Sequence, residues 1–194
     1  MTRKIAGVPV VLAAGALVLL PAGRVSAADS IVGGYASLCS TLARADRHTS
    51  DAIEICTDAL LQDLLQGHVL AATYVNRATM FIGAANYGAA LKDVDEALAV
   101  EPTLGAAYVN RGGALLGLGQ FRQSETEIDK GLALNPEEPE KAYANRALAR
   151  WHQDNIKGAY EDFMKAVELK PGWAWPKEQL THFTVTVRPR QRQP

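Results

Sequence analysis

The chain has little cysteine and almost no net charge. Only two of its 194 residues are Cys, which excludes a small scaffold held together by many disulfides. Lys and Arg total 20 while Asp and Glu total 21, and this balance argues against general binding to nucleic acid, which depends on neutralising phosphates. Hydrophobic residues make up 48% of the chain, so disorder is excluded as a description of the whole.

A single long apolar run lies at the N-terminus. Arg3 and Lys4 precede an uncharged apolar run over residues 5–20, and small residues ending at Ala27 follow it. This order is typical of a secretory signal peptide, and the run is short for the alternative, a membrane anchor. We therefore predict that residues 1–27 are a signal peptide cleaved after Ala27, that the protein is exported to the periplasm, and that the mature chain has no membrane span.

An internal period of 34 or 35 residues follows. The tetrapeptide Tyr-Val-Asn-Arg at 74–77 recurs at 108–111, and Tyr-Ala-Asn-Arg stands at 143–146. Small residues recur at spacings that let two helices cross closely, and a proline ends each unit because it cannot continue a helix. The pattern predicts one helix hairpin per unit. The recurring small residues and prolines are Ala78, Gly112, Ala147; Ala90, Ser124, Ala159; Ala97, Gly131, Ala166; and Pro102, Pro136, Pro171.

This pattern resembles the tetratricopeptide repeat family. The resemblance implies an all-α fold, a right-handed superhelix of stacked helix hairpins. Three clear units are expected, with a divergent N-terminal hairpin before them, a C-terminal capping helix after them, and a basic tail at the end. The expected repeats and C-terminal segments span residues 71–104, 105–138, 140–172, 173–182 and 183–194.

All three units depart from the family at one position. The family usually has Leu three residues after the aromatic, whereas this chain has Arg, and each Arg is followed sixteen residues later by an acid. We predict ion pairs between helices, which fix geometry more surely than they add stability. A row of anion-binding arginines is the alternative. The predicted pairs are Arg77 with Asp93, Arg111 with Glu127, and Arg146 with Asp162.

The repeat frame extends upstream into a divergent hairpin at about 35–66, which carries both cysteines. Cys39 takes the slot of Arg77, and Ile55, the neighbour of Cys56, takes the slot of Asp93. The Arg and the acid are thus lost together, and Cys39 faces the helix that carries Cys56. Given export, we predict a disulfide between the two cysteines.

The concave side of such a superhelix is the expected binding surface. The resemblance implies that Asn76, Asn110 and Asn145 form a ladder along it, because an amide can donate to and accept from a peptide backbone. Repeat duplication alone would also explain the recurrence. Lys141 and Trp151 are further candidate partner contacts, and packing of Trp151 against the terminal helix is the alternative for that side chain.

The chain lacks a phosphate loop, G-x-S-x-G, H-E-x-x-H and an EF-hand loop. The cysteines and histidines are too widely spaced for a structural zinc site. We therefore predict no catalytic residues, metal or cofactor. The favoured function is an exported adaptor that binds a peptide segment or protein partner in its concave groove. The alternatives are a structural subunit of an envelope assembly that uses the outer face, and a redox or small-molecule role at the cysteine hairpin.

Overall fold

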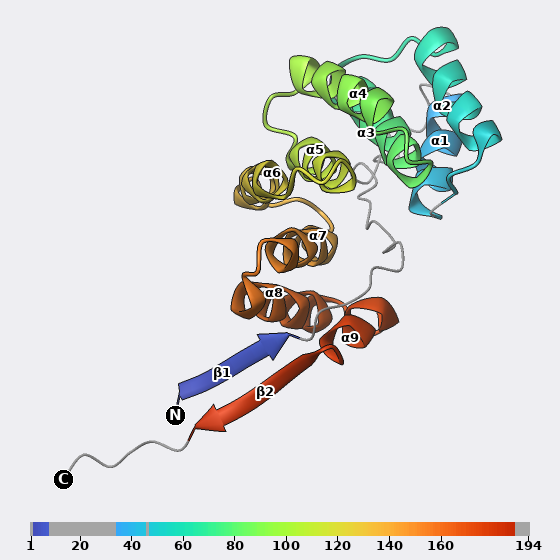
Figure 1. Cartoon of the computed structure of the whole chain (residues 1–194). Coiled ribbons are helices and arrows are strands. Elements are labelled where there is room, and N and C mark those ends of the chain that lie inside the picture. The colour runs from blue at the N-terminus through green and yellow to red at the C-terminus, as the bar shows by residue number, and fades with distance from the viewer. Residues whose placement is uncertain (1, 8–33, 46, 189–194) are drawn as a thin grey trace.

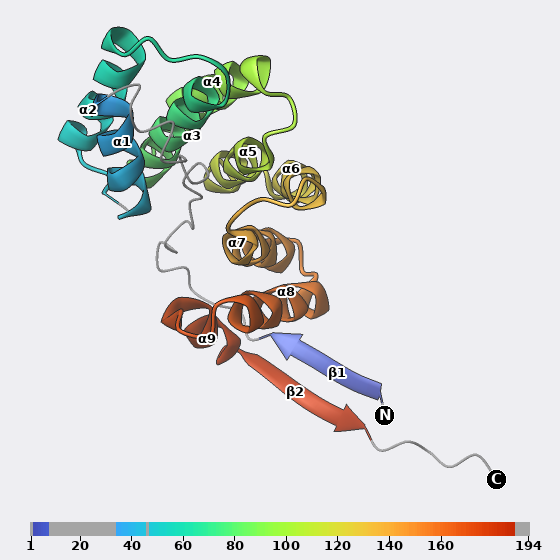
Figure 2. The same cartoon turned by 180° about the vertical axis from the view of Figure 1, so that it is seen from behind.

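The computed structural model describes residues 2–7, 34–45 and 47–188, and within these ranges the protein is a stack of antiparallel helix hairpins. The first helices of the four hairpins are α1, α3, α5 and α7, and α9 follows the last hairpin (Figures 1 and 2). The predicted all-α superhelix is confirmed. In chain order the elements are β1 (Thr2–Gly7), α1 (Gly34–Arg44), α2 (Ser50–Gln62), α3 (Gly67–Gly83), α4 (Tyr87–Val100), α5 (Gly105–Gly117), α6 (Phe121–Ala133), α7 (Pro139–His152), α8 (Ile156–Leu169), α9 (Ala174–Leu180) and β2 (Phe183–Arg188).

The turn inside each of the three regular hairpins depends on one left-handed residue. Ala85, Gly119 and Asp154 have φ values of 58°, 73° and 59°, and they stand at equivalent places in the repeat. The side chains of Asn86 and Asn155 then accept hydrogen bonds from backbone N–H groups in the first turns of α4 and α8. A short loop can therefore reverse the chain and begin the second helix.

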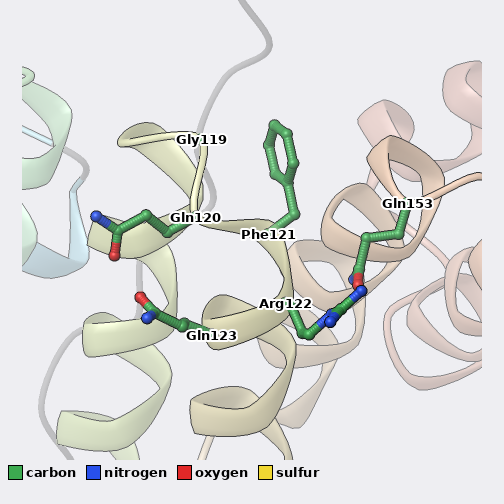
Figure 3. A pocket seen from close by; sticks show the side chains of 6 residues that line it. All are labelled: Gly119, Gln120, Phe121, Arg122, Gln123 and Gln153. Atoms are coloured by element: carbon green, nitrogen blue, oxygen red, sulfur yellow. The ribbon is translucent and has the colours of Figure 1, made fainter.

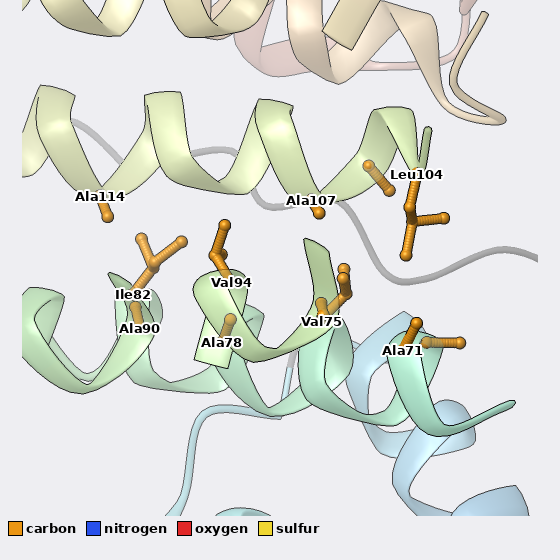
Figure 4. Close-up of a cluster of buried hydrophobic side chains, with 12 residues drawn as sticks. Ala71, Val75, Ala78, Ile82, Ala90, Val94, Leu104, Ala107 and Ala114 are labelled. Carbon is orange, nitrogen blue, oxygen red and sulfur yellow. The ribbon is translucent and has the colours of Figure 1, made fainter. Parts of the chain in front are cut away.

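Small side chains let the helices of neighbouring hairpins approach closely (Figure 4). The same holds within a hairpin: a Cβ at Gly112 on α5 would lie 2.4 Å from Ile128 Cγ1 on α6, so that crossing has no room for a larger residue. Larger side chains, such as Val75, Ile82 and Val94, fill the space between α3, α4 and α5 and are buried. Burial of this apolar surface is the main stabilising contribution.

One arginine in each regular repeat joins its own hairpin to the preceding one. Arg77 on α3 donates to both carboxylate oxygens of Asp93 on α4, over 2.8 and 2.7 Å, and to Thr57 Oγ1 on α2 over 3.1 Å. Arg146 on α7 makes the same two-oxygen contact with Asp162 on α8, over 2.9 and 2.7 Å. It also reaches back 2.5 Å to Asp129 on α6.

The arginine of the middle repeat also contacts two hairpins, but here the contact with the preceding hairpin is the closer one. Arg111 on α5 forms its close contact with Asp95 on α4 of the preceding hairpin. Its contact with Glu127 on α6 is longer, at 3.7 Å. The three predicted pairs are therefore present, and each arginine has a second partner one repeat upstream.

The first hairpin has a disulfide where the other hairpins have an arginine and an acid. Cys39 on α1 and Cys56 on α2 are bonded, and both are fully buried. Met80 on α3 covers them, with its Sδ 3.5 Å from Cys56 Sγ. The covalent bond therefore lies in the apolar interface between the first and second hairpins.

The C-terminal end of the array differs from the predicted basic tail. Residues 183–188 form β2, which pairs antiparallel with β1 in the register Gly7↔Phe183 to Thr2↔Arg188. The alternating Phe, Val and Thr residues suit a strand, and the required partner comes from the far end of the sequence. β1 belongs to the predicted signal peptide, whose cleavage site lies outside the described residues, as do residues 189–194 of the tail.

Loss of the Arg77 guanidinium should expose the cost of a buried, unpaired carboxylate. The side chain of Asp93 is only 5% exposed, and burial raises its pKa although Arg77 opposes that rise. We expect Arg77→Leu to lower the free energy of unfolding by about 3 kcal/mol in urea titrations followed by circular dichroism. Adding Asp93→Ala should recover part of that loss, because no buried charge then remains. Lys92→Leu is the control, because Lys92 is exposed on α4 beside Asp93. An equal loss of unfolding free energy in this variant would contradict the role of the buried carboxylate.

Reduction of the disulfide should destabilise the first hairpin. The bond closes a loop of 17 residues, which corresponds to about 3 kcal/mol in the chain-entropy description. We expect the melting temperature of the oxidised chain to fall when a phosphine reductant is added. The Cys39→Ala, Cys56→Ala double variant should melt at the same temperature with and without reductant. An unchanged melting temperature of the wild type after complete reduction would remove the structural role of the bond.

Candidate functional site

The three predicted ladder residues occupy one equivalent position on successive first helices. Asn76 lies on α3, Asn110 on α5 and Asn145 on α7, and each is 1% exposed. Each of the three side chains has an interaction partner. The structure therefore brings them into one column along the array, buried within it.

The contacts of Asn110 show what one member of this column does. Its Nδ2 donates to Val75 O over 3.2 Å and to Thr79 Oγ1 over 2.8 Å, both on α3. A side-chain amide has two N–H donors, so both are committed to the neighbouring first helix. Asn110 thus stacks α5 on α3, and its N–H groups do not clamp a peptide carbonyl in this structure.

The next step of the column has a different neighbour. Gly113 on α5 stands in the slot that Thr79 occupies on α3, and a Cβ at Gly113 would lie 3.7 Å from Asn145 Nδ2. Asn145 therefore packs beside a glycine, which offers no hydroxyl. Only the hydroxyl contact of the preceding step therefore lacks a counterpart, and Asn145 still has a partner.

Lys141, the predicted basic contact, lies in the first turn of α7. It is buried, and its Nζ is 3.2 Å from Glu138 Oε2. Burial raises the pKa of Glu138, with Lys141 opposing the rise. The neighbouring Glu140 accepts a hydrogen bond from Lys170 over 3.1 Å. The charge of Lys141 is thus balanced within the protein.

Trp151, the predicted aromatic anchor, belongs to the C-terminal core. Its ring lies 4.7 Å from that of Phe183 and 6.1 Å, edge to face, from that of Phe163. Such pairs stabilise packing beyond their buried area. Trp151 therefore packs at the C-terminal end of the array, which is the alternative considered for this side chain. This packing does not support a role as an anchor for a partner.

A hollow opens on the turn side of the array, at the start of α6 (Figure 3). Phe121 forms part of it and stacks on His152, with ring centroids 4.2 Å apart and planes 3° from parallel. Burial lowers the pKa of His152. The hollow is open to solvent, and its lining residues are Gly119, Gln120, Phe121, Arg122, Gln123 and Gln153.

The paired arginines and cysteines are engaged inside the fold. The second partners of the arginines, Thr57, Asp95 and Asp129, were not predicted from the sequence. Asp95 and Asp129 each stand two residues after the predicted acid of their unit, so the signal was present. Within the described ranges, no three His, Cys, Asp or Glu side chains gather as a metal site. In the same ranges, no helix is both long and apolar enough to cross a membrane.

Residues 140–172, which contain α8 and nearly all of α7, match the family model described as tetratricopeptide repeat. No curated protein matches the chain. The first TPR of Spaghetti (RPAP3), solved bound to the HSP90 peptide SRMEEVD, has a TM-score of 0.53 and is 22% identical, covering 58% of this chain and 88% of that one. The first TPR domain of human RPAP3 has a TM-score of 0.53 and is 22% identical, covering 58% of this chain and 87% of that one.

MamA also has a similar fold, with a TM-score of 0.54 and 16% identity over 74% of this chain and 80% of that one. At these identities the likeness is one of fold alone. The chain therefore contains a tetratricopeptide repeat at residues 140–172, within a fold of the tetratricopeptide repeat type.

Proposed function

We propose that the chain is an exported scaffold that acts by binding an extended segment of a partner protein along its first helices, α3, α5 and α7. The observation that carries this proposal is the stack of first helices, in which α3 packs on α5 and α5 on α7 with an asparagine at one position on each, in a fold like that of a peptide-bound tetratricopeptide repeat. Burying an amide costs free energy unless its hydrogen bonds are made. The Asn110 amide makes such bonds to α3, and Asn145 also has a partner, so the column joins the first helices that would line the groove.

The chemistry around the column favours recognition of a peptide main chain. Its neighbours on the first helices, such as Val75, Val109 and Ala144, are small or apolar and buried, so they add no charge to this side of the array. Lys141 is balanced by Glu138, so a strongly acidic segment has no unpaired cation to meet at that position. An uncharged, extended segment bound through its backbone fits these groups better. The TPR of Spaghetti, bound to its HSP90 peptide, supports peptide binding by analogy of fold.

Export to the periplasm is part of the same proposal. The basic and then apolar N-terminal residues support it, and the disulfide between Cys39 and Cys56 is compatible with an oxidising compartment. A scaffold of this kind needs no catalytic residue or cofactor, because its work is to hold a partner.

Replacing the column should abolish partner binding. We expect the Asn76→Ala, Asn110→Ala, Asn145→Ala variant to lose the proteins that the wild type captures by crosslinking in its native envelope. Because Asn110 bonds two groups on α3, the variant must first be shown to stay folded by circular dichroism.

A matched control changes the outer helices at equivalent repeat positions. Lys92, Thr126 and Glu161 are exposed on α4, α6 and α8, and their joint replacement by Ala should leave capture unchanged. Partners that the asparagine variant still captures and this control variant loses would contradict binding in the groove. They would identify the outer face as the working surface, as in a structural subunit.

A further inference from the structure

Among the described residues, four large apolar side chains of the first hairpin are exposed, and Leu61 and Leu64 are the two exposed most. Leu61, near the end of α2, is 77% exposed, and Leu64, in the following loop, is 88% exposed. Their neighbours Leu60 and Leu65 pack inward against Ala36 and Ala59. The hairpin core is therefore already supplied, and the other two leucines are left in contact with water.

The repeats provide an internal comparison for this position. Leu61 stands two residues after Ala59, where the next two hairpins have exposed alanines, Ala99 and Ala133. The fold does not require Leu at this position. Leu64 lies in the connection to α3, where the spacing between hairpins is about four residues longer than elsewhere. Apolar side chains that the fold does not use mark a surface that something else covers.

The surroundings of these leucines are acidic. α2 carries Asp51, Glu54 and Asp58 and has no Lys or Arg. Glu54, Asp58 and Leu61 follow the i, i+4, i+7 spacing and so share one face of the helix. We call these three residues, together with Leu64 three positions further along the chain, the leucine face. No ion pair within the described part of the chain involves its two carboxylates, and Asp58 only accepts a hydrogen bond from Gln62.

The complementary charge lies at the other end of the same chain. Residues 183–194 contain Arg188, Arg190 and Arg192 and no acidic side chain. β2, which ends at Arg188, projects beyond α8 and α9, whereas α2 lies at the opposite end of the stack (Figures 1 and 2). β2 and α2 therefore lie at opposite ends of one molecule. Two copies that paired through their leucine faces would bring like charges together, which is unfavourable.

We propose that the basic C-terminal segment of one copy binds the leucine face of a second copy. The guanidinium groups pair with Glu54 and Asp58, while the arginine methylene groups cover Leu61 and Leu64. The contact joins different surfaces of the two copies, so in a pair one copy keeps an unused leucine face and the other keeps an unused C-terminal segment. Copies then associate head to tail, and the column of asparagines takes no part.

Sedimentation of the full oxidised chain over a range of concentrations tests the association. We expect the average mass to rise with concentration at low salt and to fall back at high salt, because the contact is partly ionic. The Leu61→Ala, Leu64→Ser variant should associate at least about tenfold more weakly, since two apolar side chains no longer leave water. The variant with Arg188, Arg190 and Arg192 changed to Gln should weaken to a similar degree.

The matched control removes three other cations from the same end of the molecule. Lys157, Lys165 and Lys177 lie on α8 and α9, and changing them to Gln should leave association within about twofold of the wild type if the arginine segment is the ligand. A labelled synthetic peptide of residues 183–194 should also bind the wild type and bind the leucine variant more weakly.

Three outcomes would overturn the proposal. A wild type that stays monomeric and does not bind the peptide excludes the contact. Association that the leucine variant leaves unchanged excludes the leucine face. Association that the leucine variant loses but the arginine variant keeps excludes the C-terminal segment as the occupant. These measurements do not depend on the groove, so loss of groove binding leaves them unaffected.

Discussion

The bridging arginine of each repeat is the interaction on which the rest of the array depends. In a stack of hairpins each unit touches only its neighbours, so the geometry of every junction must be fixed locally. A guanidinium can hold two carboxylate oxygens in its own hairpin and still donate to the hairpin before it. Arg77 and Arg146 do both, whereas Arg111 makes its close contact with Asp95 of the preceding hairpin and lies 3.7 Å from one oxygen of Glu127 in its own. A leucine at this position would fill space without specifying the register between hairpins.

The two ends of the array lack this device and are stabilised differently. At the N-terminal end the disulfide between Cys39 and Cys56 takes its place, with Met80 packed against it. At the C-terminal end the slot that holds Asp95 and Asp129 in earlier units is Met164, which is exposed. An aromatic cluster that contains Trp151 and Phe183 closes the stack there instead.

The asparagine column lies buried along the first helices of the regular repeats. Where a threonine lies beside it, as at Asn110, the amide joins adjacent first helices. Where a glycine lies beside it, as at Asn145, the hydroxyl contact has no counterpart, although Asn145 still has a partner. A recurring polar side chain can in this way make different contacts in successive repeats.

The sequence alone determined the helical hairpins, their limits to within a few residues and the partners sixteen residues apart. These features follow from local periodicity and from contacts within one hairpin, both of which repeat visibly. The cysteine pair was accessible for the same reason, because its two slots match an arginine and an acid in the other units. Only the tertiary structure decided which side chains the stacking buries. It committed the N–H groups of Asn110 to α3, drew Trp151 into the C-terminal core and paired β2 with β1. These contacts join different hairpins or distant segments, whose distances the repeat period does not encode.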